Sequence, residues 1–187
     1  MSEPKVPNIR LEKISLERLV GLHEAVLESS QDWFAAGMID KPELSIEELE
    51  TGIKDFLNRW ENDDFYMFFI LDELTNHVLG FTFLNHVSRQ YQMANLGYAI
   101  RTSRLGEGIA TEAARKVAQY GFEKLNLQRI EIVVGKDHLA SLKVAEKAGA
   151  VREGLLRNRL LSHSSPIDAY MHSLIPSDLS IHKPAYQ

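Results

Sequence analysis

Apolar residues along this chain recur at two spacings, which predict helices and strands respectively. Spacings of three and four residues predict helices over about 15–27, 46–60, 109–125 and 138–147. Shorter runs of alternating or continuous apolar residues predict strands over about 9–11, 66–71, 78–87, 94–101, 129–135, 151–160 and 167–175. The resulting order is strand, two helices, three strands, helix, strand, helix and two strands, which indicates one mixed α/β layer structure.

Local signals set the ends of these elements. Ser45 and Glu48 have the spacing of a capping box, and Gly149 follows the last periodic residue of the fourth helix. A turn is expected at residues 163–166 between the last two strands. We expect Ser15 to cap the first helix, whose apolar face would consist of Leu16, Leu19, Val20, Leu22, Val26 and Leu27.

Residues 31–42 follow neither spacing, and we expect them to be irregular. They carry two aromatic residues, Trp33 and Phe34. Such residues either line a substrate cleft or cover the core, and the second role is the more frequent one.

The clearest chemical signal is a glycine-rich turn between a strand and a helix. The strand at 96–100 leads to Gly106 and Gly108, and Ala110 and Thr111 then open the third helix. Glycines allow a ligand to approach the backbone closely, and the unpaired amides at a helix start attract an anion. The segment is either a phosphate-binding turn or a tight connection without a ligand, because short glycine motifs recur by chance.

Composition excludes several classes of protein. The chain has 187 residues, 44% of them hydrophobic and 25% charged, which fits one ordinary globular domain. Its formal net charge of −5 does not indicate a nucleic-acid partner or an anionic membrane. No cysteine is present, so a disulfide, a thiolate metal site and a cysteine nucleophile are excluded. We expect no metal, no membrane segment and a cytoplasmic location.

Residues 96–154 resemble the acetyl-CoA-binding half of the GNAT N-acetyltransferases, in particular the RimJ/RimL branch, which acetylates the N-termini of ribosomal proteins. Four segments occur in the family's order: LGYAI, LGEGIATEA, RIEIVVG and HLASLKVAEKAGAVREG. Before Met93 the agreement is mainly in the order of elements. The resemblance implies a GNAT fold of the α/β (α+β) class, with a mixed, mostly antiparallel central sheet and helices on both faces. It implies a single domain over 1–187, with flexible tails at 1–7 and 180–187.

The resemblance also implies a reaction. An amine attacks the thioester of acetyl-CoA directly, so the ammonium must first lose a proton, the oxyanion needs a donor, and the leaving thiolate needs a proton. The acceptor expected is a primary amine, either a protein N-terminal α-amino group, as on a ribosomal protein, or a small amine such as a polyamine or an aminoglycoside. A coenzyme A-binding module without catalysis is the alternative outside enzymes. A monomer and a homodimer are equally compatible with the sequence.

By the same resemblance, the thioester would lie between two splayed strands, and the diphosphate would lie on the glycine turn. His138 and Lys147 would contact the pantetheine arm and a phosphate, although each is also an ordinary polar residue near a helix end. Arg104 would screen the phosphate charge or be a plain surface residue. The expected coenzyme contacts are Leu96, Tyr98, Ile100, Arg104, Leu105, Gly106, Glu107, Gly108, Ile109, Ala110, Thr111, His138 and Lys147.

The chain departs from the family's pattern at several positions. Its Leu105 replaces a frequent Gln or Arg, which is tolerable because amides bind the phosphate there. The other departures are His138 for the usual Asn, Ala145 for a frequent tyrosine acid, Ala150 for Phe, and Asn95 for a common Glu. The last of these removes one candidate base.

Two residues are the candidates for catalysis. Ser141 is expected to protonate the thiolate, directly or through water, as the resemblance to the RimL-like branch implies; its alternative is a helix-surface hydroxyl. His86 is expected to take the amine proton, since an imidazole titrates near neutral pH, although a lone strand histidine is more often structural. Glu153, Asp168 and an ordered water are the other possible bases.

Overall fold

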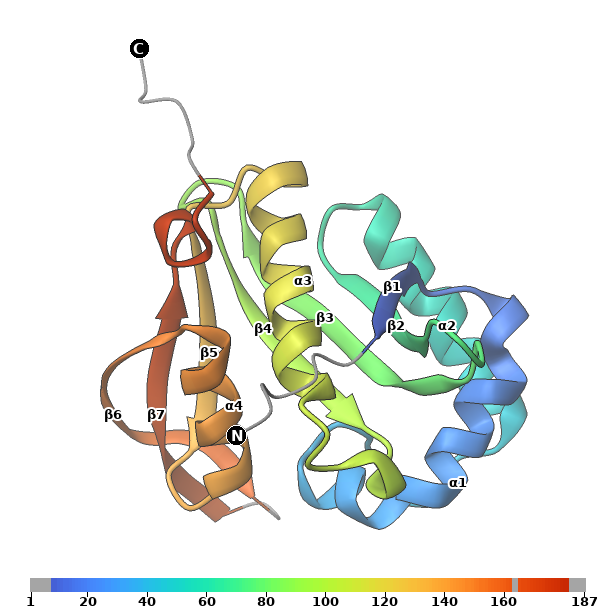
Figure 1. Cartoon of the computed structure of the whole chain (residues 1–187). Helices are drawn as coiled ribbons and strands as arrows, with labels where there is room; N and C mark the ends of the chain where they lie inside the picture. The colour runs from blue at the N-terminus through green and yellow to red at the C-terminus, as the bar shows by residue number, and fades with distance from the viewer. Residues whose placement is uncertain (1–7, 163–164, 182–187) are drawn as a thin grey trace, which may run out of the picture.

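The computed structural model describes residues 8–162 and 165–181. Figure 1 shows the arrangement of the elements. The helices are α1 (Leu19–Ala35), α2 (Ile46–Glu61), α3 (Ile109–Lys124) and α4 (Leu139–Ala148), with short 3-10 turns η1 (Leu16–Arg18), η2 (Thr102–Arg104) and η3 (Pro176–Leu179). The strands are β1 (Ile9–Lys13), β2 (Tyr66–Asp72), β3 (Val78–Ser88), β4 (Met93–Ile100), β5 (Arg129–Gly135), β6 (Val151–Ser162) and β7 (Ser165–Leu174).

All seven strands form one sheet in the order β1-β2-β3-β4-β5-β7-β6. Each neighbouring pair is antiparallel except β4 and β5, which run parallel because α3 connects them. The mixed, mostly antiparallel sheet predicted from the sequence is therefore confirmed. The sheet is open, with β1 at one edge and β6 at the other.

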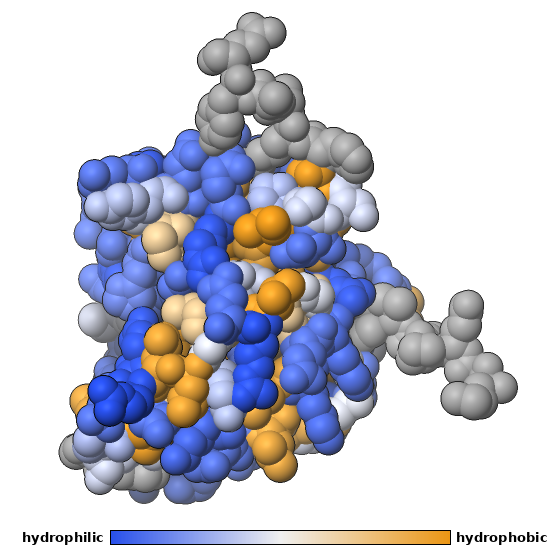
Figure 2. All heavy atoms as spheres, turned by 90° about the vertical axis from the view of Figure 1, so that its left-hand side faces the viewer, coloured by the Kyte–Doolittle hydropathy of each residue, from blue (hydrophilic) through white to orange (hydrophobic). Residues whose placement is uncertain are grey.

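The β6 edge is the most exposed part of the sheet. Its residues are almost all exposed, and three of them are large and apolar: Val151, Leu155 and Leu161. Figure 2 looks onto this side of the molecule, where apolar residues are separated by hydrophilic ones. Scattered apolar residues of this kind are normal on a protein surface.

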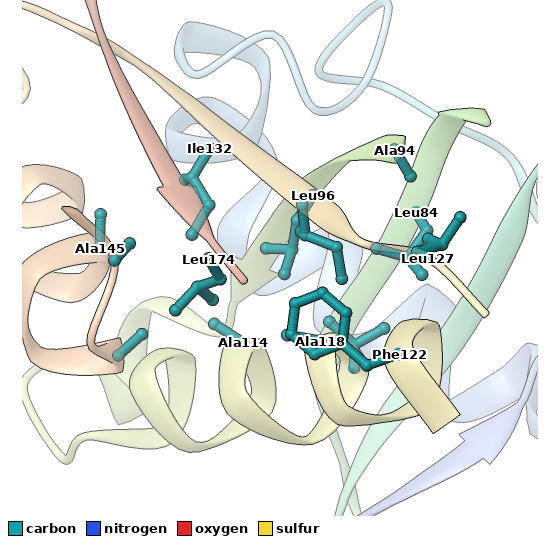
Figure 3. Close-up of a cluster of buried hydrophobic side chains, with 14 of the residues drawn as sticks. Leu84, Ala94, Leu96, Ala114, Ala118, Phe122, Leu127, Ile132, Ala145 and Leu174 are labelled. Carbon is teal, nitrogen blue, oxygen red and sulfur yellow. The ribbon is translucent and has the colours of Figure 1, made fainter. Parts of the chain in front are cut away.

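Helices cover both faces of the sheet, as expected. On one face α3 and α4 pack against β3, β4, β5 and β7. The side of α3 that meets the strands consists of small residues such as Ala114 and Ala118, which allow close approach, while Phe122 fills the space beyond them (Figure 3). Because Leu96 and Ile132 point toward α3, alternate residues of β4 and β5 must point to the opposite face.

On the other face α1 and α2 pack over β2 and β3. The capping box predicted at Ser45 and Glu48 is present, with both reciprocal hydrogen bonds. Gly149 ends α4 with φ +98°, in the left-handed region that glycine adopts most easily, also as predicted.

Three expectations about the first helix are wrong. The Ser15 side chain makes no capping hydrogen bond, and the turn that follows it is the 3-10 turn η1 rather than the α-helix itself. The predicted face includes Leu16, Val20 and Leu27, which are exposed. Ala25, Ser29 and Trp33 are buried beside Leu22 and Val26 in its place, because the sheet meets α1 on a rotated face.

The third error concerns residues 31–42, since α1 continues to Ala35 and only the rest is irregular. Trp33 is 3% exposed, and its indole Nε1 donates a hydrogen bond to the carbonyl oxygen of Ile100. Trp33 therefore belongs to the core and ties α1 to the end of β4. Phe34 is partly buried on the same helix.

The predicted ends of the chain fall mostly outside the described residues. Residues 1–7, 182–187 and the first half of the expected turn, 163–164, are not described. Within the described part, Ser165 and Pro166 already belong to β7 rather than to a turn. Ile181 was predicted to lie in a flexible tail, but it packs against the core, and its amide donates to the carbonyl oxygen of Pro176.

Candidate active site

The site is organised by the separation of β4 from β5. The two parallel strands pair only at Met93, Ala94 and Asn95, opposite residues 129–131. Beyond Asn95, β4 continues to Ile100 and β5 continues to Gly135 without pairing to each other. The strands thus form a V that opens toward their carboxyl ends, and backbone groups of both strands inside the V have lost their ladder partners.

The glycine loop lies at the open end of the V, between the end of β4 and the start of α3. Gly106 and Gly108 have φ +81° and +82°, in the left-handed region. Within the described residues, the amides of 106–111 donate no hydrogen bond to any protein atom, and the first bonded amide is that of Glu112. Several unpaired donors at one helix start form a site for an anion such as a diphosphate.

The amides at the start of the loop are not available in the same way. Those of Arg104 and Leu105 already donate to the carbonyl oxygens of Arg101 and Thr102. The Arg104 guanidinium pairs with the carboxylates of Glu107, at 2.8 Å, and Asp72, at 3.5 Å. Arg104 and Glu107 therefore contact each other. To reach a phosphate, the Arg104 guanidinium would have to break its ion pairs with Glu107 and Asp72.

Three of the expected coenzyme contacts have buried side chains. Leu96, Ile100 and Ile109 are 3%, 7% and 1% exposed and belong to the core. These residues can therefore contact a ligand only through their backbone, which is the role predicted for the strand and loop positions. Ala110 and Thr111 are partly buried in the first turn of α3.

The side of the V toward α4 brings Tyr98 and Ser141 together. The Tyr98 hydroxyl, from β4, donates to the backbone carbonyl oxygen of Ser141 at 3.4 Å. Burial raises the pKa of Tyr98 to about 12, so this phenol keeps its proton at neutral pH. The structure thus places a protonated phenol against the backbone of Ser141, and this phenol was predicted only as a coenzyme contact.

His138 and Lys147 lie at the two ends of α4. The Nδ1 atom of His138 accepts a hydrogen bond from the Ser141 amide at 3.2 Å, so the imidazole caps the helix as an Asn side chain would. Lys147 is exposed in the last turn, and its carbonyl oxygen accepts a bond from Arg115 of α3. Because Arg115 lies about two helical turns after the start of α3, this contact places the end of α4 near the glycine loop.

The face of the sheet opposite α3 carries a row of polar residues at the closed end of the V. Asn85, Asn95, Glu131 and Ser173 are successive register partners on β3, β4, β5 and β7, and we call them the polar row. The Asn95 Nδ2 atom donates to Asn85 Oδ1 at 2.9 Å, while Asn95 Oδ1 is buried with no partner among the described residues. Such an acceptor favours a cation nearby.

Glu131 places a carboxylate next to the position where the family's glutamate is missing. Its Oε1 atom accepts a bond from Arg129 Nε at 2.9 Å, and the side chain is 17% exposed. Asn95 is its register partner on the adjacent strand, and adjacent strands lie about 5 Å apart. Sequence reasoning overlooked Glu131; the alternation of Ile130 and Ile132 around it was the available signal.

The other candidate bases have different surroundings. His86 is exposed on a bulge of β3 with φ +51°, one residue past Asn85 and thus beyond the closed end of the V. Arg129 and Ser173 bind Glu153, and their hydrogen bonds lower its pKa to about 2. Asp168 accepts a bond from the Asn158 amide and pairs with Lys136. Glu153 therefore contacts the polar row through Ser173 but is held by Arg129, whereas neither His86 nor Asp168 belongs to the row.

Neither a metal centre nor a membrane span is found in the described residues. No group of three or more His, Asp or Glu side chains there could hold a metal ion. No helix in residues 8–162 and 165–181 combines the length and the apolar character needed to cross a bilayer.

A sheet that splits between two parallel strands, with unbonded amides at the opening, is suited to holding a phosphate-bearing ligand. The family model of the acetyltransferase (GNAT) domain matches residues 8–151, so this chain belongs to the GNAT acetyltransferase family. The resemblance to the GNAT family deduced from the sequence is thereby confirmed.

Individual relatives agree with this assignment. An uncharacterized N-acetyltransferase p20 of Bacillus licheniformis is 35% identical over 108 residues, which are 58% of this chain and 61% of that protein. The spermidine N(1)-acetyltransferase of Escherichia coli K12 is 34% identical over 73 residues, 39% of this chain and 38% of that protein. This chain spans about three fifths of the length of such curated relatives as p20.

A solved structure covers more of the chain. That of a putative ribosomal-protein-serine acetyltransferase from Vibrio cholerae superposes with a TM-score of 0.74 at 26% identity, covering 94% of this chain and all of that one. The order of elements is therefore common to the two proteins beyond the region matched by the family model.

Proposed function

We propose that this protein transfers the acetyl group of acetyl-CoA to a primary amine. The observation that carries the proposal is the combination of the V between β4 and β5 with the unbonded amides of residues 106–111 at its opening. A diphosphate bound to those amides would direct the pantetheine arm into the V, where unpaired strand amides can bind the thioester carbonyl oxygen.

The acceptor proposed is a protein N-terminal α-amino group, as in the RimJ/RimL branch. The similarity to the Vibrio cholerae protein supports it. The similarity to a spermidine acetyltransferase supports a polyamine as the second candidate. The polar row suits either amine, since an ammonium group arriving there would meet Asn95 and Glu131.

The reaction needs a base before the attack. We propose that Glu131, directly or through a water molecule, takes the proton of the ammonium group, and that the neutral nitrogen then attacks the carbonyl carbon of the thioester. His86 is the alternative base proposed from the sequence, and its exposed position at the bulge requires an intervening water chain.

Collapse of the tetrahedral intermediate needs an acid. The carbon–sulfur bond breaks, and the thiolate of coenzyme A takes a proton from Ser141 or from Tyr98 on the same side of the V. The amide nitrogen gives up its second proton to solvent, from which the hydroxyl of Ser141 or Tyr98 is protonated again. The raised pKa of Tyr98 favours its protonated state before each turnover. The backbone amides of β4 would bind the oxyanion.

The proposal is tested by release of coenzyme A thiol in the presence of a panel of amines, together with mass spectrometry of each amine. We expect thiol release that depends on the amine and adds one acetyl group to it. Tight binding of acetyl-CoA without acetylation of any peptide, polyamine or aminoglycoside would show a coenzyme-binding module instead.

A further inference from the structure

A cavity of about 440 Å³ lies between α1, α2 and the sheet face that these helices cover, and none of the roles above uses it. Its volume falls within the range of small-ligand sites. The wall is mostly apolar and aromatic, and it includes Ile53, Phe56, Phe65, Met67, Phe81 and Phe83.

The cavity adjoins the strand that borders the V. Phe83 of β3 is the register partner of Gly97 on β4, and its ring lies directly against that glycine. A Cβ atom at Gly97 would lie only 2.3 Å from Phe83 Cζ, so a glycine is required for the ring to lie there. Gly97 lies in the part of β4 that has separated from β5.

The polar row is adjacent to the same wall. The Asn85–Asn95 register pair lies two residues along the strands from the Phe83–Gly97 pair, on the same sheet face, a separation of about 7 Å. An amine at the polar row could therefore extend an attached side chain of a few carbon atoms into the cavity.

The charged residues that line the cavity are all acidic. Asp40, Glu48 and Asp55 line it, and Glu48 is already bonded to Lys41 and to the Ser45 amide. Asp40 and Asp55 have no ion pair in the described part of the chain and are exposed at the rim. Carboxylates at the rim attract a cationic amine, whereas the apolar interior disfavours a second ammonium group because desolvating it is costly.

We infer that this cavity receives a bulky apolar group of the acceptor, so that the substrate is a primary amine with an aromatic or branched aliphatic group near its nitrogen. The inference rests on the proposed acetyl transfer and specifies its substrate class. The same chemistry occurs in a peptide that begins with Phe or Leu and in a free amine such as phenethylamine.

Initial rates with the full-length protein separate these possibilities. Phe-, Leu- and Gly-initiated peptides of otherwise identical sequence are compared with phenethylamine and spermidine at saturating acetyl-CoA. We expect kcat/KM for the Phe and Leu peptides to exceed that for the Gly peptide by about 10- to 100-fold, the effect of burying one such side chain. Phenethylamine matching the Phe peptide would identify a free amine as the natural source, and a lower rate would identify a peptide.

A substitution that fills the cavity provides the second test. Gly52 of α2 lines the cavity, and a Cβ atom there meets no atom within 4 Å. Gly52→Leu should lower kcat/KM for the Phe peptide at least about tenfold while leaving that for the Gly peptide and the KM of acetyl-CoA within about twofold. Thr51→Leu, one residue earlier on the exposed side of α2, is the matched control and should change neither.

The two hypotheses fail in different ways. Acetyl transfer that favours spermidine or the Gly peptide, or equal losses for all amines in Gly52→Leu, overturns the inference and leaves the proposed function intact. Absence of transfer to every amine, with acetyl-CoA still bound, overturns the proposed function and the inference together.

Discussion

The glycine loop gives the sharpest prediction, because its backbone geometry and its proposed ligand can be tested separately. Gly106 has φ +81°, and a Cβ atom there would meet no protein atom within 4 Å. In Gly106→Ala the left-handed conformation costs about 1–2 kcal/mol. This cost lowers Tm by about 2–8 °C in a domain of this size.

We expect Gly106→Ala to weaken the binding of coenzyme A more than its loss of stability alone would. The added methyl group projects from the loop into open space beside the unbonded amides, where the diphosphate would lie. Loss of one charge-assisted hydrogen bond costs about 1.5–3 kcal/mol, which corresponds to a rise in Kd of roughly 10- to 100-fold. Calorimetric titration with coenzyme A, without an acceptor, measures this directly.

Gly149→Ala is the matched control. Gly149 has φ +98°, and a Cβ atom there makes only ordinary contacts at 3.9 Å, so the backbone cost is similar. It ends α4 and lies outside the loop. We expect the two variants to lose similar stability but only Gly106→Ala to lose affinity. Equal Kd values for the two variants would refute the assignment of the loop.

Three further predictions concern the site and its surroundings. Glu131→Gln should lower kcat about 10²- to 10⁴-fold with the KM of acetyl-CoA within about twofold, whereas an unchanged kcat would assign the proton to another group. Ser141→Ala should lower kcat at least about tenfold with the KM of acetyl-CoA within twofold; a loss seen only in Tyr98→Phe would assign the acid to the phenol. Glu153 has a folded-state pKa of about 2, below that of an unfolded glutamate near 4.3, so its contribution to stability is complete above about pH 5 and is lost as the pH falls toward 2. Because this carboxylate is 41% exposed, we expect a loss of about 1 kcal/mol between pH 5 and pH 2 that is absent in Glu153→Gln, as urea unfolding would measure.

Local sequence signals predicted the features that depend on neighbouring residues. The capping box at Ser45 and Glu48 and the glycine end of α4 are set by residues within a few positions of each other, and both are present. The glycine loop belongs to the same class, since two glycines before a helix start leave amides unbonded whatever lies elsewhere in the chain.

Errors arose where a distant element decides the outcome. The buried face of α1 is set by the strands it packs on, so the periodicity of Leu16, Val20 and Leu27 was misleading. The extension of α1 to Ala35 is stabilised by the hydrogen bond from Trp33 to Ile100, 67 residues away.

The composition of the site was decided by strand register. Within single segments the sequence determined which amides of the loop lack a partner. Along the chain it determined the succession of strands and helices. Only the tertiary structure joined Asn85, Asn95, Glu131 and Ser173 into one row and set Phe83 against Gly97, because such pairings depend on which strands are neighbours and how they align. Those contacts between distant segments provide the proposed base and the acceptor cavity.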